Sequence, residues 1–246
     1  MVMKTQKLLF VLFLSLSVVA FSQVQDTILL QKILQQLKLT EKQINTEIIA
    51  SKPLPYLSGK TALVIPKYKV NEEDQYGNYY FEIEPYVVVA DQKTGKIINQ
   101  YHIPDVWVSD AVRLSDITID TGLYQLNNNT RAFGVRVGYT GSSNPNPYSK
   151  TDLSLFIIQG NKIKRVLNNY TVYDYGGEWD TRCAGEFEVM SAVIDIDKMQ
   201  SKGFNNLILK ITDETTKSIQ TADDCIEKKK STKRTKTLKF NGKEYQ

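Results

Sequence analysis

From Gly59 to its end, the chain is a series of short apolar segments separated by turn residues. Apolar and polar residues alternate within the segments, which is the pattern of β-strands with one buried side. Segments 153–158 and 163–167, joined by Gln-Gly-Asn, predict a hairpin. About ten such strands, with no helical pattern after residue 52, predict an all-β domain over residues 55–246.

Two all-β architectures fit this order of strands and turns. A unit of strand, short turn and strand recurs at 87–101, 153–170 and 207–221, and such recurrence is typical of propellers. A twisted sandwich of two sheets produces the same order of strands and turns. We therefore expect a propeller-like or sandwich fold with a short N-terminal helical segment.

Helical periodicity is confined to residues 26–51. The apolar residues at helical spacing are Leu30, Ile33, Leu34, Leu37, Ile44 and Ile48. Thr40 followed by Gln43 resembles a capping box, which would divide the stretch into two short helices. We expect residues 23–52 to form a helical segment that covers an edge or end of the β domain, and a docking helix for a partner is the alternative.

The N-terminus has the pattern of a secretory signal. Two lysines precede an apolar run over 8–20, and Ala20 and Ser22 place small residues where a signal peptidase reads. The run is shorter than the ~20 residues of a membrane-spanning helix. We expect residues 1–22 to be removed, and the mature protein to be periplasmic or extracellular without stable membrane insertion.

Charge is distributed unevenly along the chain. The formal net charge is +4, but residues 226–246 carry eight basic residues and only two acidic ones. Cations are not spread over a face with aromatic residues among them, so we expect no nucleic-acid partner. The basic segment could contact an acidic envelope surface, or form a solvated strand whose buried side comes from Leu238 and Phe240.

The two cysteines, Cys183 and Cys225, predict one disulfide, because an exported protein folds in an oxidising compartment. Two separately buried thiols are the alternative. The single histidine, His102, does not complete a zinc site with two thiols.

One acidic pair and one aromatic group are candidate sites. Glu186 and Glu188 lie two apart and share a strand face, as paired carboxylates of a glycoside hydrolase could. A solvated strand face beside a disulfide is the alternative. Tyr173, Tyr175 and Trp179 could stack on a sugar or anchor a protein partner, unless they pack over the Cys183 region.

Several segments resemble known families. Residues 87–97 resemble a strand pair of a propeller blade, and residues 194–197 with 203–208 resemble a degenerate FG-GAP or VCBS-type repeat. Residues 131–136, 146–148 and 153–156 resemble an uncharacterised exported bacterial family of β-propeller-like proteins. The resemblance covers residues 55–246 and implies a fold rather than an activity.

Intact repeats of this type bind calcium through an Asp-rich loop, which makes Asp195 and Asp197 the candidate metal ligands. Calcium needs six to eight oxygens, and here Lys198 follows where a further acid is expected. We therefore expect no cofactor, with calcium as the alternative. The two acids would otherwise face water at a strand end.

No catalytic motif stands out, and we predict no catalytic residues. The sequence favours an exported, non-enzymatic binding or interaction module whose partner is a protein or glycan of the cell envelope. A hydrolase with paired carboxylates and an inhibitor of an envelope enzyme are the alternatives; a protruding loop near 144–148 would favour the inhibitor.

Overall fold

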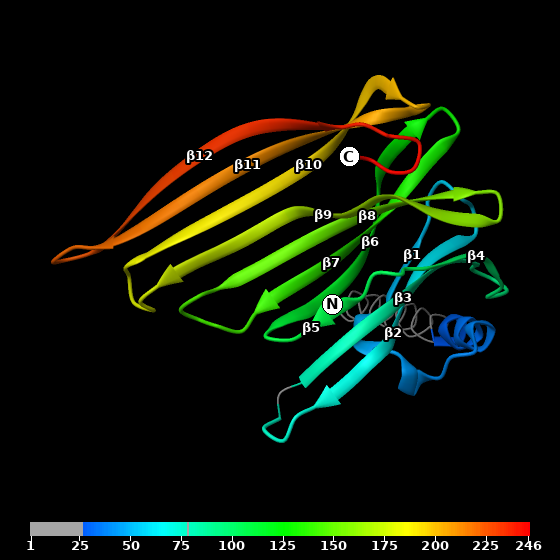
Figure 1. Cartoon of the computed structure of the whole chain (residues 1–246), viewed down its shortest axis with the longest axis horizontal. Coiled ribbons are helices and arrows are strands. Elements are labelled where there is room, and N and C mark those ends of the chain that lie inside the picture. Colours follow the sequence, from blue (N-terminus) through cyan, green and yellow to red (C-terminus); the bar gives the residue numbers. More distant parts are fainter. Residues whose placement is uncertain (1–26, 78) are drawn as a thin grey trace, which may run out of the picture.

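The computed structural model of the protein describes residues 27–77 and 79–246 (Figure 1). The predicted signal, residues 1–22, lies outside this range. Over the described residues, no helix combines the length and the apolar character needed to cross a membrane.

Within the described residues, twelve strands form two antiparallel sheets. The small sheet has the order β1 (Ala50–Pro53), β2 (Lys60–Glu73), β3 (Tyr79–Asp91) and β4 (Ile97–His102), and β5 (Trp107–Ser109) also pairs with β3. In the large sheet each strand pairs with the next: β6 (Val112–Asn127), β7 (Thr130–Gly141), β8 (Tyr148–Gln159), β9 (Lys162–Trp179), β10 (Gly185–Ser201), β11 (Phe204–Gln220) and β12 (Cys225–Leu238). The all-β class is confirmed, and the arrangement is sandwich-like with no clear propeller.

The N-terminal region is helical only in part. A helix spans residues 27–37, and two 3-10 turns follow, η1 (Glu41–Gln43) and η2 (Thr46–Ile48). The expected helical structure up to residue 51 is wrong at its end, because strand β1 already begins at Ala50. The backbone N–H of Asn45 donates to the Pro66 carbonyl at 2.9 Å, so the small sheet as well as its own 3-10 turns holds this stretch.

Three apolar clusters hold these elements together. The helix packs Ile33 and Leu34 on the outer face of the small sheet, against residues such as Ile65 and Val88. The inner face of the small sheet packs on the large sheet, and Phe156 lies at the centre of this second cluster. Its ring centroid lies 5.8 Å from that of Phe133 and 5.9 Å from that of Tyr101 on the opposite sheet.

The large sheet divides into two leaves, and the third cluster lies between them. Strands β9 and β10 pair only from Tyr173 to Trp179 and from Gly185 to Ser191. Away from this seam, β9 pairs with β8 and β10 with β11. Leu153 and Leu167 of one leaf pack with Leu207 and Leu209 of the other in the same cluster.

Beyond the clusters, four strand ends project as a bare sheet that we call the wing (Figure 1). The wing consists of residues 173–179 of β9, 185–191 of β10, 212–220 of β11 and 225–232 of β12. Buried hydrophobic residues of these strands stop at Val172, Ile211 and Leu238, so no hydrophobic strand residue of the wing is buried. Apart from Ser218, which is buried, the strand residues of the wing keep solvent-accessible surface, so neither face is covered by another layer.

Substitution Phe156→Ala tests the role of the contact between the sheets. Phe156 has no exposed surface, so its truncation leaves a cavity and should lower the free energy of unfolding by about 3–5 kcal/mol. Urea denaturation followed by circular dichroism measures the change. The control Val193→Ala, at a side chain that is 65% exposed, should change it by less than ~0.5 kcal/mol. Equal effects of the two variants would contradict the assignment of Phe156 to the core.

Candidate functional site

The predicted disulfide is confirmed and lies at the tip of the wing. Cys183 in the β9–β10 turn is bonded to Cys225 at the start of β12, with the two Cα atoms 5.7 Å apart. The bond therefore connects the two turns at the tip across β10 and β11. Asp180 shapes the first turn, because its carboxylate accepts hydrogen bonds from the backbone N–H groups of Arg182 and Cys183, each at 2.8 Å. These bonds lower the pKa of Asp180.

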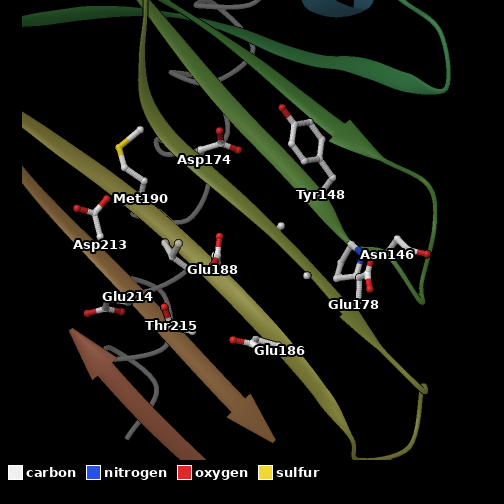
Figure 2. A pocket seen from close by; sticks show the side chains of 14 residues that line it. Asn146, Tyr148, Asp174, Glu178, Glu186, Glu188, Met190, Asp213, Glu214 and Thr215 are labelled. Carbon is white, nitrogen blue, oxygen red and sulfur yellow. The ribbon is translucent and has the colours of Figure 1, made fainter. Parts of the chain in front are cut away.

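One face of the wing is an acidic hollow (Figure 2). In the register of β9 and β10, Glu186 lies opposite Glu178, and Met190 lies opposite Asp174. Because directly opposed residues of antiparallel strands share a face, these side chains form one surface together with Glu188. The hollow has a volume of about 760 Å³. Its other lining residues include Tyr148 of β8, Asp213 and Thr215 of β11, and Asn146 in the β7–β8 loop.

Only some of these carboxylates have a cationic partner. Arg234 of β12 donates two hydrogen bonds to Asp213, from Nε at 2.7 Å and from Nη2 at 3.2 Å, and they lower the pKa of that carboxyl. The Lys217 Nζ lies 3.7 Å from Glu186 Oε2. Among the described residues, Glu178 and Glu188 have no ion pair, whereas Asp174 lies opposite Lys150 of β8. The surface is therefore negative at its centre.

The other face of the wing is aromatic. Phe187 of β10 stacks on Tyr175 of β9, with ring centroids 6.3 Å apart and planes 10° apart, and its centroid lies 6.1 Å from that of Trp179. Gly177 lies opposite Phe187, and a Cβ at Gly177 would come within 2.4 Å of the Phe187 ring. Glycine is thus needed there for the ring to lie across β9. Tyr173 occupies the same face, opposite Ser191.

The loop between β7 and β8 is attached to this region. The indole Nε1–H of Trp179 donates to the Asn144 carbonyl at 2.6 Å, and the Trp179 backbone N–H donates to the Pro145 carbonyl at 3.0 Å. Asn146 and Pro147 of the loop line the acidic hollow. Trp179 therefore holds the loop in place. Its indole and backbone N–H groups are both paired within the protein and cannot donate to a partner.

The structure separates the residues that the sequence singled out. Glu186 and Glu188 are both exposed and lie on one side of β10, as predicted. Phe187, Asp174 and Asp213 were missed, because their place in the site depends on which strands pair. Alternation of apolar Phe187 and Val189 with the two glutamates is the one sequence signal that could have added Phe187 to the aromatic group.

Asp195 and Asp197 lie outside the wing. Asp195 forms an ion pair with Lys210 of β11, and the Asp197 carboxylate accepts a hydrogen bond from the Met199 backbone N–H at 3.2 Å. Over residues 27–77 and 79–246, no group of three or more His, Cys, Asp or Glu side chains could hold a metal ion. Calcium at Asp195 and Asp197 stays the untested alternative to the expectation of no cofactor.

Comparison of the chain with protein-family models, curated proteins and solved structures gives no match. The resemblance to propeller-like families and to FG-GAP repeats therefore stays a prediction.

The double variant Cys183→Ser/Cys225→Ser tests whether the disulfide holds the wing. Without the closed loop, opening of the wing should become easier by about 2–4 kcal/mol. Hydrogen exchange of backbone amides, resolved by mass spectrometry, should show faster exchange over 173–191 and 212–232. Amides of β2, β3 and β7, which flank the Phe156 cluster, serve as the internal control and should keep their protection. A uniform loss of protection would show instead that the bond stabilises the whole domain.

Proposed function

We propose that the protein is an exported, non-enzymatic binding module that holds a protein or glycan of the cell envelope on its wing. The observation that carries the proposal is that the wing is an ordered four-stranded sheet with neither face covered by another layer. Isolated sheets normally need a covering layer for stability. Here a disulfide and cross-strand pairs keep an uncovered surface in a defined shape, which suits recognition.

The aromatic face is the part of the wing best suited to direct contact. Tyr175 and Phe187 are only partly buried, and their stacked rings lie on a regular pair of strands. Rigid aromatic side chains bring a large contact area at a small cost in conformational entropy. Rings of this kind stack on sugars and anchor protein partners. An inhibitor of an envelope enzyme is a special case of this function, in which the attached loop at 144–147 would join the contact.

A hydrolase is the second candidate, because carboxylates from two strands line one hollow. Glu178 and Glu188 have no cationic partner among the described residues, and they share this surface with Glu186. Hydrolysis of a glycoside requires one carboxyl group as acid and a second as base or nucleophile. Asp213 is a poor general acid, because Arg234 lowers its pKa.

Variants of the aromatic face test the binding function. The oxidised mature protein, immobilised as bait, is presented with envelope extract of its native host, and the captured partner is identified by mass spectrometry. Tyr175→Ser and Phe187→Ser should each weaken the measured affinity for that partner at least about tenfold, as expected for buried aromatic anchors. The matched control Tyr76→Ser removes an aromatic side chain that is 81% exposed in the β2–β3 turn, and should bind normally. Equal affinity of the wild type and the three variants would show that the aromatic face does not contact the partner.

Glu188→Gln separates binding from hydrolysis. This change removes one charge from the hollow without changing its shape, and should leave capture of the partner unchanged. A panel of glycan and peptide substrates, assayed with the wild-type protein, provides the second readout. Turnover that Glu188→Gln reduces more than about a hundredfold would establish the hydrolase and overturn the non-enzymatic proposal.

A further inference from the structure

The outermost strand of the wing, β12, combines an open edge with concentrated positive charge. It pairs with β11 alone and forms one margin of the large sheet (Figure 1). Every residue of β12 before Leu238 is exposed. An edge strand presents a row of unpaired backbone N–H and C=O groups along its outer side. These groups match the backbone of a further extended chain.

The cations of β12 point to both sides of the sheet. Lys228 and Lys230 lie opposite Lys217 and Thr215 of β11, on the face of the acidic hollow. Lys229 and Lys233 lie at the alternate positions and project to the aromatic face. An added strand also sends its side chains alternately to the two faces. Its acidic residues would therefore meet a lysine whichever way they point.

Three of these cations are available for a partner. Lys228, Lys230 and Lys233 take part in no ion pair within the described residues. By contrast, Arg234 forms an ion pair with Asp213, and the Nζ of Lys229 lies 3.3 Å from Oε2 of Glu227. The unpaired positive charges are therefore distributed along β12 and are not concentrated at one position.

The neighbouring strands exclude other anionic partners. Glu186 and Glu188 lie two strands from β12 on one face, a separation of about 10 Å, which is comparable to the screening length in physiological salt. Glu214 of β11 lies beside Ser231 on the other face. A flat anionic surface, laid on either face, would be repelled by these carboxylates. Only an approach along the edge avoids them.

A second copy of the chain is also excluded as the occupant of this edge. In the register centred on Thr232, antiparallel pairing of two β12 strands would set Lys228 and Lys230 of one copy opposite Lys236 and Arg234 of the other. Like charges directly opposite each other destabilise a pair of strands. Lysines on an edge strand commonly prevent such self-association.

We propose that β12 binds an extended acidic polypeptide segment, which adds to the large sheet as a further strand. Backbone hydrogen bonds along the edge supply the affinity, and Lys228, Lys230 and Lys233 select acidic side chains. The inference deepens the proposed binding function, since it gives the chemistry of a partner for the same wing.

The test uses the oxidised mature protein and a fluorescein-labelled peptide of about ten alternating Glu and Thr residues, a sequence with strand propensity. Fluorescence polarisation measures its affinity. A second peptide has the same sequence and charge but carries an N-methyl group on every backbone nitrogen, so neither of its edges can donate backbone hydrogen bonds to β12. The first peptide should bind, and the second should bind at least about tenfold more weakly.

Charge reversal at the edge provides the matched pair of variants. The triple variant Lys228→Glu/Lys230→Glu/Lys233→Glu should weaken binding of the first peptide at least about tenfold. All three side chains are exposed, so the fold should be retained, which circular dichroism checks. The control Lys93→Glu/Lys96→Glu/Lys164→Glu makes the same change in net charge at exposed lysines outside the wing, and should bind within about twofold of wild type.

Three results would overturn the inference. The N-methylated peptide could bind as well as the first one, which would leave charge alone as the cause. Vesicles containing phosphatidylglycerol, or inorganic polyphosphate, could bind through the same lysines while the peptide does not. Sedimentation could reveal a dimer that the edge variant abolishes. If the peptide fails but an envelope partner is still captured through Tyr175 and Phe187, the inference falls and the proposed function stands.

Discussion

The structure depends on the packing of the two sheets around Phe156. This side chain contacts Phe133 within its own sheet and Tyr101 on the other, so it joins the halves of the chain on either side of β6. The helix covers the outer face of the small sheet, and the two leaves of the large sheet enclose their own cluster. Because these clusters are buried, the strand ends of the wing stay attached to the domain without a covering layer of their own.

The wing shows how an exposed sheet can be kept ordered. Each cross-strand pair contributes only about 0.2–1 kcal/mol, which is small beside the burial of an aromatic side chain. The long register between β10 and β11 supplies many such pairs, and the bidentate contact of Arg234 with Asp213 joins β12 to them. Within the wing, charges are sorted by strand, with carboxylates on residues 173–179 of β9 and 185–191 of β10, and most of the cations on β12.

The strands with strict alternation could be predicted from the sequence, because one buried side imposes a period of two residues. The hairpin of β8 and β9 was predictable for another reason, since two apolar segments flank a short turn, although β8 is buried on both faces over residues 152–157. The disulfide was predictable because the chain has only two cysteines. Ile44 and Ile48 have helical spacing but bury in turns against the sheet, and spacing alone does not distinguish the two cases. The meeting of Asp174 and Asp213 in one hollow depends on register across three strands, which no local pattern contains.

The disulfide also determines how the wing bears mechanical load. Residues 183–225 form a covalent ring that contains the whole of β10 and β11. Tension applied near the start of β12 passes through the sulfur atoms to the β9–β10 turn, and from there into β9, which is paired with β8 in the body of the domain. Strand β12 cannot be peeled from its tip without moving the whole ring, so an attached partner pulls on four strands at once.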